Sequence, residues 1–252
     1  MMNYNRPIVL SIAGFDPTGG AGVLADVKTF EQHNCLGMAI LTGNTNQTET
    51  DFISVDWIGK EKISSQLLPI LENYRISAVK IGIVENLETL SGILEVIRAS
   101  SEAVPVVWDP VLAASSGFEL HTGFDRVLLE ELLKSVNLVT PNVNEARKLM
   151  GEEDEIEAAF QLGKHTSVLL KGGHSALRQG IDLLIENQVS REIKGAINKK
   201  LRPKHGSGCI LSAAIASNLA LGASLPEACQ HAKNYIERRL ASNTNLLAYH
   251  AG

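Results

Sequence analysis

One short segment of the sequence, HGSGC at positions 205–209, carries residue types that are suited to chemistry. Its two glycines let backbone amides turn inward as an anion-binding nest at the start of the apolar helix expected over 208–221. Such a nest could hold a phosphoryl group during transfer. Cys209 would lie in the first turn, where the helix dipole can lower the pKa of a thiol and make it a base for a substrate hydroxyl. The alternative is a glycine turn before a buried helix, with Cys209 as an inert apolar residue.

Four polar residues follow or end predicted strands and could serve a nucleotide. Asn142 and Glu145 are three positions apart, so they would share one face at a helix start, where a carboxylate can hold a hydrated Mg²⁺ that bridges ATP phosphates. The same pair could simply cap the helix, with Asn142 as N-cap and Glu145 at N3. Lys171 could contact phosphate or be an ordinary strand-end cation. Asp109 could contact metal-bound water or only begin an Asp-Pro turn.

A second glycine-rich stretch, GFDPTGGAG at positions 14–22, follows the first predicted strand. It has neither the GxGxxG spacing of a dinucleotide fingerprint nor the GxxxxGK[ST] of a P-loop. So many glycines could let the backbone approach a flat substrate, with Asp16 or Asp26 accepting hydrogen bonds from it. A purely structural turn is the alternative.

The elements that must position these residues alternate between strand and helix. The predicted strands are 7–14, 78–82, 104–108, 136–140 and 167–171, and the predicted helices include one through Leu24, Val27 and Phe30 and others over 87–97, 143–150 and 208–221. Residues 180–195 read as an antiparallel hairpin that turns at 186–188. Gly222 is predicted as a left-handed C-cap, and Ser224 with Glu227 as a capping box for a final helix.

This alternation predicts an α/β protein in three layers, α/β/α, with a mostly parallel central sheet covered by helices on both sides. In such sheets ligands bind beyond the carboxyl ends of the strands, where the polar residues above would collect. At 252 residues we expect one domain spanning 1–252, with a frayed tail after about residue 243.

Composition excludes several classes of protein. The chain is 44% hydrophobic and 20% charged, as globular proteins are. No apolar run reaches the roughly 18 residues of a membrane span, and the first residues lack the apolar core of a signal peptide, so we expect a cytoplasmic protein without a membrane partner. Three cysteines and scattered histidines suggest neither disulfides nor a protein-built metal centre. A formal net charge of −5 disfavours a nucleic-acid partner.

Taken together, several segments resemble the hydroxymethylpyrimidine/phosphomethylpyrimidine kinases of thiamin synthesis, which belong to the ribokinase-like superfamily. The resemblance spans almost the whole chain, and the order of the segments matters more than any one motif. The strings that carry it are SIAGFDPTGGAGVLADVKTF, AVKIGIVEN, PVVWDPVLAASSG, LVTPNVNEARKLMG, VLLKGGH and KHGSGCILSAAIASNLALG. A ribokinase-like fold, ATP and Mg²⁺ as cofactors, and a homodimer are what the resemblance implies.

The resemblance also implies roles for the acceptor substrate, a small pyrimidine alcohol. Asp26 and Gln47 would contact the pyrimidine, and Gly14 would lie against its ring. Cys209 occupies the position of the catalytic base, which is aspartate in sugar-kinase relatives and in typical pyridoxal kinases. The anion hole would comprise Gly206, Ser207 and Gly208.

On the nucleotide side, the resemblance implies that Asn142 and Lys171 contact ATP and that Glu145 contacts Mg²⁺ through water. Asp109, at the mouth of the crevice, is expected to be an ATP-binding residue as well. The γ-phosphoryl group would pass in line to the hydroxyl group, and catalysis would come mostly from positioning and from neutralising the phosphoryl charge.

The sequence departs from the family pattern within the site. Where the family reads GSDSGGGAGIQAD, the departures here are Phe15, Pro17, Thr18 and Leu24, and Lys204 replaces a small polar residue. The first four could alter substrate shape, and Lys204 could alter the nucleotide side. Two alternatives therefore stay open, a pyridoxal kinase with a thiol base and a non-catalytic pyrimidine-binding regulator.

Overall fold

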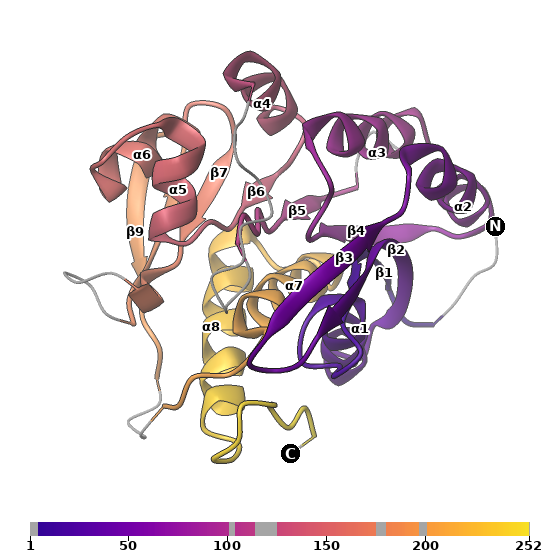
Figure 1. The fold of residues 1–252 in the computed structure, drawn as a ribbon. Helices are drawn as coiled ribbons and strands as arrows, with labels where there is room; N and C mark the ends of the chain where they lie inside the picture. Colours follow the sequence, from indigo (N-terminus) through magenta and orange to yellow (C-terminus); the bar gives the residue numbers. More distant parts are fainter. Residues whose placement is uncertain (1–4, 101–103, 114–124, 175–179, 197–200, 252) are drawn as a thin grey trace.

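In the computed structural model, which describes residues 5–100, 104–113, 125–174, 180–196 and 201–251, nine strands form one sheet (Figure 1). In their order across the sheet they are β3 (Phe52–Trp57), β2 (Leu36–Gln47), β1 (Ile8–Phe15), β4 (Ile76–Ile81), β5 (Val106–Trp108), β6 (Leu138–Val139), β7 (Ser167–Leu170), β8 (Asp182–Glu186) and β9 (Val189–Ile193).

The six strands from β2 to β7 run parallel, whereas β3, β8 and β9 pair antiparallel at the two edges. Helical crossovers between neighbouring strands favour this parallel arrangement. The predicted hairpin is confirmed: Glu186 pairs with Val189, and both loop residues, Asn187 and Gln188, have positive φ, as a tight two-residue turn requires.

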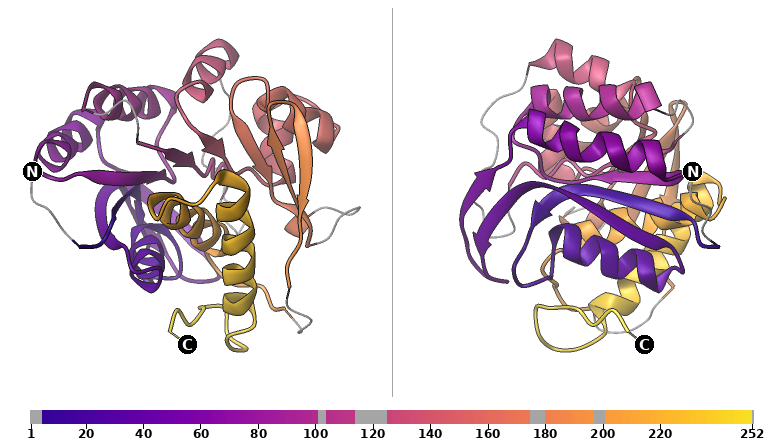
Figure 2. Two further views of the ribbon diagram at one scale, coloured as in Figure 1. Left: turned by 180° about the vertical axis from the view of Figure 1, so that it is seen from behind. Right: turned by 90° about the vertical axis from the view of Figure 1, so that its right-hand side faces the viewer.

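Helices cover both faces of the sheet, which confirms the predicted three layers (Figure 2). One face carries α1 (Gly22–Gln32), α7 (Ser207–Ala220) and α8 (Leu225–Leu240); the other carries α2 (Lys60–Asn73), α3 (Leu87–Ser100), α4 (Arg126–Leu133), α5 (Val143–Met150) and α6 (Glu155–Leu162). A short 3₁₀ turn, Gly172–His174, follows β7.

Two apolar clusters, one on each face, form the core. Along β1, Ile8, Leu10 and Ile12 belong to the cluster under α2 and α3, whereas Val9 belongs to the one under α1 and α7. Because successive strand side chains point to opposite faces, a strand buried on both sides is mostly apolar, as β1 is apart from Ser11, which finds a hydrogen-bond partner in Asp26.

The predicted helices are present, and their ends follow the predicted caps. Helix α5 begins at a capping box of Asn142 and Glu145. Helix α7 is followed by the left-handed Gly222, and α8 begins at the predicted capping box of Ser224 and Glu227. The sequence patterns did not reveal β2, β3, α2, α4 or α6, in part because the second half of β2 is polar and α2 contains Pro69.

The tail after α8 differs from the expectation of a frayed end. Its backbone carbonyls accept hydrogen bonds from Arg239, Lys204 and the amide of His205, which lie in α8 and in the loop before α7. Figure 2 shows the tail folding back below α1. Composition could not reveal this, because the partners are distant in sequence.

None of the helices in the described part of the chain is long and apolar enough to cross a lipid bilayer.

Phe30 tests the packing of α1 on the sheet, because its ring is fully buried in the cluster under α1 and α7. We expect Phe30→Ala to lower the free energy of unfolding by about 3–5 kcal/mol, since it leaves a cavity. Urea denaturation measures this. The matched control is Val127→Ala, whose side chain is 74% exposed and which should change the free energy by about 0.5 kcal/mol or less. Equal effects of the two substitutions would contradict the packing described here.

Candidate active site

The glycine turn predicted before α7 is present, and it lies against the glycine-rich loop after β1. Helix α7 begins at Ser207, and Gly206 caps it in the left-handed conformation with φ of 70°. A Cβ on Gly206 would lie 2.0 Å from the carbonyl oxygen of Gly20. Glycine is therefore required at position 206 both by the backbone angle and by the close approach of the two loops.

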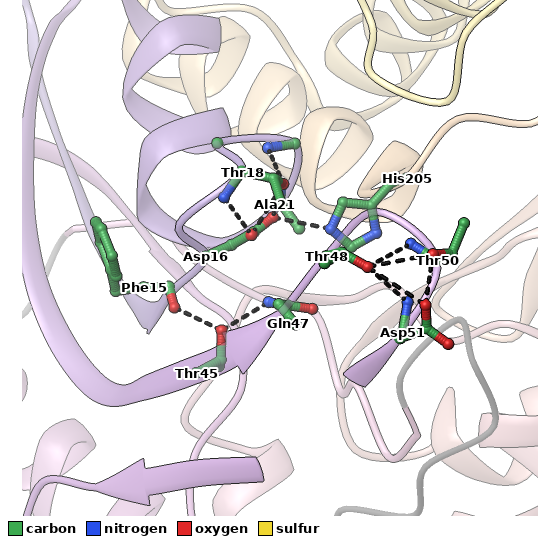
Figure 3. Close-up of polar contacts among 12 residues, drawn as sticks. Phe15, Asp16, Thr18, Ala21, Thr45, Gln47, Thr48, Thr50, Asp51 and His205 are labelled. Atoms are coloured by element: carbon green, nitrogen blue, oxygen red, sulfur yellow. Dashed lines mark hydrogen bonds and ion pairs between the residues drawn. The ribbon is translucent and has the colours of Figure 1, made fainter. Parts of the chain in front are cut away.

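Asp16 fastens these two loops together (Figure 3). Its buried carboxylate accepts hydrogen bonds from the amides of Thr18 and Ala21, at 2.9 and 2.8 Å, and from Nε2 of His205, at 2.8 Å. Burial alone would raise the pKa of Asp16, but the bonds from His205, Thr18 and Ala21 hold it below its usual value. Thr18, one of the departures from the family pattern, bonds to Asp16 inside the protein. We therefore infer that Thr18 stabilises the conformation of the glycine-rich loop.

Cys209 lies in the first turn of α7 with its side chain partly exposed. Burial, with the nearby carboxylates of Asp26 and Asp109, nevertheless raises the pKa of Cys209 to about 11, against the opposing charge of Lys80. The predicted lowering of this pKa by the helix dipole is therefore wrong, because desolvation dominates.

Asp26 lies beneath the site, with its side chain fully buried. Its Oδ2 accepts hydrogen bonds from Ser11 Oγ at 2.6 Å and from Lys80 Nζ at 2.8 Å. The charge of Asp26 raises the pKa of Lys80, although burial alone would lower it. The geometry does not support the predicted direct contact of Asp26 with a pyrimidine, because no part of this side chain reaches the surface; it places a buried ion pair near Cys209.

Asp109 and Lys171 form a second ion pair, at the nest. Lys171 Nζ lies 2.8 Å from Asp109 Oδ1, and Ser212 of α7 bonds to Oδ2 at 3.1 Å. Burial alone would raise the pKa of Asp109, but Lys171 and Lys80 hold it below its usual value. A Cβ on Gly208 would lie 3.3 Å from Lys171 Nζ, so the missing side chain lets the ammonium group approach the nest.

Asn142 and Glu145 lie beside this ion pair and cap α5, which is the alternative role that the sequence pattern predicted for them. Each side chain bonds to the backbone amide of the other, at 2.9 and 2.7 Å, and Glu145 Oε2 lies 3.7 Å from Lys171 Nζ. Burial, together with the charge of Asp109, raises the pKa of Glu145 against the effect of Lys171. The backbone of Asn142 pairs with Lys171, so capping also fixes the edge of the site.

Gly14 and Gln47 lie on the side of the site away from Lys171, on the adjacent strands β1 and β2. A Cβ on Gly14 would lie 2.4 Å from Cδ1 of Ile83, so a larger residue there would require the Ile83 side chain to move. Gln47 is half-buried, and its Nε2 donates to Thr45 Oγ1, which in turn donates to the carbonyl oxygen of Phe15, both at 2.8 Å (Figure 3). This chain of bonds holds the Gln47 amide beside the glycine-rich loop.

Sequence reasoning missed four polar residues that hold these groups in place. They are Ser11, Lys80, Thr140 and Ser212. Lys80 offered a usable signal, because a single charge inside the apolar run AVKIG must find a partner when the strand is buried.

The oxygen donors near Lys171 suit a hydrated Mg²⁺ better than a metal bound by protein alone. Within the described ranges, no three or more His, Cys, Asp or Glu side chains are grouped so that they could hold a metal ion. Mg²⁺ usually keeps several waters and needs only one or two carboxylates when it accompanies a nucleotide. Glu145 fits that requirement through water, because its own Oε2 already accepts the Asn142 amide.

A family model and a similar known protein both indicate the phosphomethylpyrimidine kinase family. A family model described as phosphomethylpyrimidine kinase matches residues 16–252. A hydroxymethylpyrimidine/phosphomethylpyrimidine kinase of Rhizobium meliloti is 37% identical over 250 residues, which cover 95% of this chain and 92% of that protein.

Solved structures of two related kinases share the fold, which confirms the ribokinase-like expectation. The phosphomethylpyrimidine kinase of Clostridium difficile is 31% identical, with a TM-score of 0.76 over 92% of this chain and 98% of its own. The pyridoxal kinase of Staphylococcus aureus in complex with AMP-PCP and pyridoxal is 29% identical, with a TM-score of 0.80 over 95% of this chain and 89% of its own.

The raised pKa of Cys209 predicts how its thiol reacts. In the ligand-free protein, we expect alkylation by iodoacetamide to be slow at neutral pH and to accelerate about tenfold per pH unit, because only the thiolate reacts, until the pH approaches the pKa of about 11. Mass spectrometry separates Cys209 from the buried Cys35 and Cys229. Cys209→Ser is the control for label at other sites. A rate that is already constant at neutral pH would show that the thiol is ionised there.

Proposed function

Since the chain belongs to the phosphomethylpyrimidine kinase family, it is a kinase, and we propose that it transfers the γ-phosphoryl group of ATP to the hydroxymethyl group of hydroxymethylpyrimidine in thiamin biosynthesis. The names of its relatives cover a second transfer, to the monophosphate, and the proposal includes it. One observation carries the proposal: the nest before α7, the Cys209 thiol and the Lys171 ammonium group converge beside the glycine-rich loop after β1.

On the nucleotide side, the migrating phosphoryl group would lie at the amides of residues 206–209. The Lys171 ammonium group, next to Gly208, would neutralise charge that develops on the phosphoryl oxygens. Asp109 would act through Lys171, because both of its carboxylate oxygens are already engaged inside the protein. Such a reaction needs mainly positioning and fixed charges rather than covalent chemistry by the protein.

Mg²⁺ would enter with ATP and supply charge neutralisation at the phosphates. Glu145 would hold it through water, and Asn142 would keep the Glu145 carboxylate in place through the capping box. The homodimer implied by the family resemblance stays a prediction.

On the acceptor side, the pyrimidine ring would lie over Gly14 with its polar edge at Gln47. The Gln47 amide has a donor and an acceptor to offer a heteroaromatic ring, and its place next to the loop makes it the specificity contact. Asp26 would act indirectly, because it holds the Lys80 charge close to Cys209.

Cys209 would act as the base in its thiolate form. The thiolate takes the proton of the hydroxymethyl group, that oxygen bonds to the γ-phosphorus, and the bond from phosphorus to the β–γ bridging oxygen breaks. The products are the phosphate ester, ADP and the Cys209 thiol. The charge of Lys80 favours the thiolate, although burial keeps the thiolate a minor form at neutral pH.

A pyridoxal kinase is the second candidate, and a specific observation favours it. The Staphylococcus aureus protein that shares this fold at 29% identity was solved with pyridoxal bound. Pyridoxal also carries a hydroxymethyl group on a six-membered heteroaromatic ring. Phe15, Pro17 and Leu24, which depart from the family pattern, lie in or directly after the loop where the two rings would differ in fit.

A substrate panel with phosphate counting tests the proposal. Purified protein is incubated with Mg·ATP and with hydroxymethylpyrimidine, its monophosphate or pyridoxal, and ADP and phosphorylated product are both measured. We expect the largest kcat/KM for hydroxymethylpyrimidine. In the same assay, Cys209→Ala should lower kcat by about 10²–10⁴-fold, because the general base is lost.

Each outcome of the panel decides between the candidates. A larger kcat/KM for pyridoxal would replace the proposed substrate and keep the mechanism. Binding of hydroxymethylpyrimidine without ATP consumption would favour the non-catalytic regulator. Near-normal turnover by Cys209→Ala would reject the thiol as base, whichever substrate is preferred.

A further inference from the structure

We propose that the segment after α8, residues 243–251, is a positioning element of the phosphoryl-transfer site. It would act by holding the loop of residues 204–206, which leads into the nest at the start of α7. The proposal rests on the proposed function for the role of the nest. The segment acts through Lys204 and His205, the two residues directly before Gly206. Neither the family resemblance nor the sequence patterns gave this segment a role.

Lys204 joins the nest loop to the segment. Its ammonium group donates hydrogen bonds to the carbonyl and side-chain oxygens of Asn243, at 2.9 and 2.8 Å, and to the carbonyl oxygen of Asn245. The side chain is buried, with 6% of its surface exposed. The ammonium group is therefore engaged by the segment after α8.

His205 adds a backbone connection and carries the restraint into the site. Its amide donates to the carbonyl oxygen of Leu246 at 2.9 Å, while its ring holds Asp16. A Cβ on Gly20 would lie 2.7 Å from both the His205 ring and the Leu247 side chain. The segment, the nest loop and the glycine-rich loop therefore meet at one point. There His205 of the nest loop contacts both the segment and the glycine-rich loop.

The segment is itself held in shape, so it can act as a rigid restraint. Asn243 Nδ2 donates to the carbonyl oxygen of Leu247 at 2.9 Å, and the amide of Tyr249 donates to Ser242 Oγ at 3.1 Å. The buried guanidinium group of Arg239 donates to the carbonyl oxygens of Tyr249 and His250. These bonds join the start of the segment to its middle and fasten its far part, at Tyr249 and His250, to Arg239 and Ser242 at the end of α8.

A restraint of this kind should affect the transition state more than ground-state binding. The nest amides act when charge develops on the migrating phosphoryl group, and small displacements of such donors are costly. Loss of the segment should therefore lower kcat with little change in KM for ATP.

The test compares the full chain with a chain that ends at Ser242, with Lys204→Met, and with the exposed-lysine control Lys62→Met. We expect truncation to lower kcat by about 10- to 100-fold and to change KM for ATP by less than about threefold. Lys204→Met should lower kcat in the same direction, and Lys62→Met should match the full chain. Adding a peptide of residues 243–252 should restore part of the activity of the truncated chain.

Hydrogen exchange gives a readout that does not depend on catalysis. In both the truncated chain and Lys204→Met, amides of residues 204–209 should exchange faster, whereas those of β4 should not. If the full chain phosphorylates none of the panel substrates, the proposed function fails, and exchange alone decides this inference.

Three results would overturn the inference: a kcat within about twofold of the full chain, a rise in KM for ATP with kcat preserved, or unchanged exchange at residues 204–209. If the truncated chain does not fold, Lys204→Met decides the matter by the same three criteria.

Discussion

The contact between Asp16 and His205 is the interaction on which the site depends, because it joins two loops that are 189 positions apart in the sequence. One loop follows the first strand and would receive the acceptor substrate, and the other begins α7 and would hold the phosphoryl group. The backbones of Gly206 and Gly20 approach so closely that no side chain fits between them. A small change in the relative position of the loops would therefore move the phosphoryl group away from the acceptor hydroxyl, and in-line transfer depends strongly on that alignment.

Two buried ion pairs support this arrangement from below. Lys80 with Asp26 and Lys171 with Asp109 each remove an ammonium group from water, which is unfavourable by several kcal/mol for a single ion unless a partner compensates it. Both pairs join different strands or helices, and both cations raise the electrostatic potential at the Cys209 thiol and at the nest. Each ammonium group is paired with a carboxylate, and the charges of Asp26 and Asp109 oppose the thiolate of Cys209, so the pairs favour negative charge there less than the lysines alone would. The pKa of Cys209 is raised because desolvation, together with the charges of Asp26 and Asp109, exceeds the effect of Lys80.

The sequence predicted the parallel strands, the helices α5 and α7 and the nest before α7, because apolar periodicity, caps and glycines are local signals. It also predicted that Asn142, Glu145, Lys171 and Asp109 would meet, since residues at the carboxyl ends of parallel strands share one edge. It could not predict that Asp26 is fully buried, because that depends on Lys80, which is 54 positions away. The role of Lys204 was hidden for the same reason: its partners lie about forty positions further along the chain. Local patterns specify elements, whereas partners distant in sequence specify which polar groups face the substrate.

A double-mutant cycle across the Asp16–His205 contact tests the central claim most directly. kcat for phosphorylation of the preferred substrate is measured for Asp16→Asn, His205→Gln, the double variant and the unchanged chain. If this one contact aligns the two loops, each single substitution lowers kcat, and the double variant is hardly slower than the slower single one, with a coupling energy of about 1–3 kcal/mol. Effects that simply add, with a coupling energy near zero, would contradict the claim that this contact holds the phosphoryl-binding nest against the substrate loop.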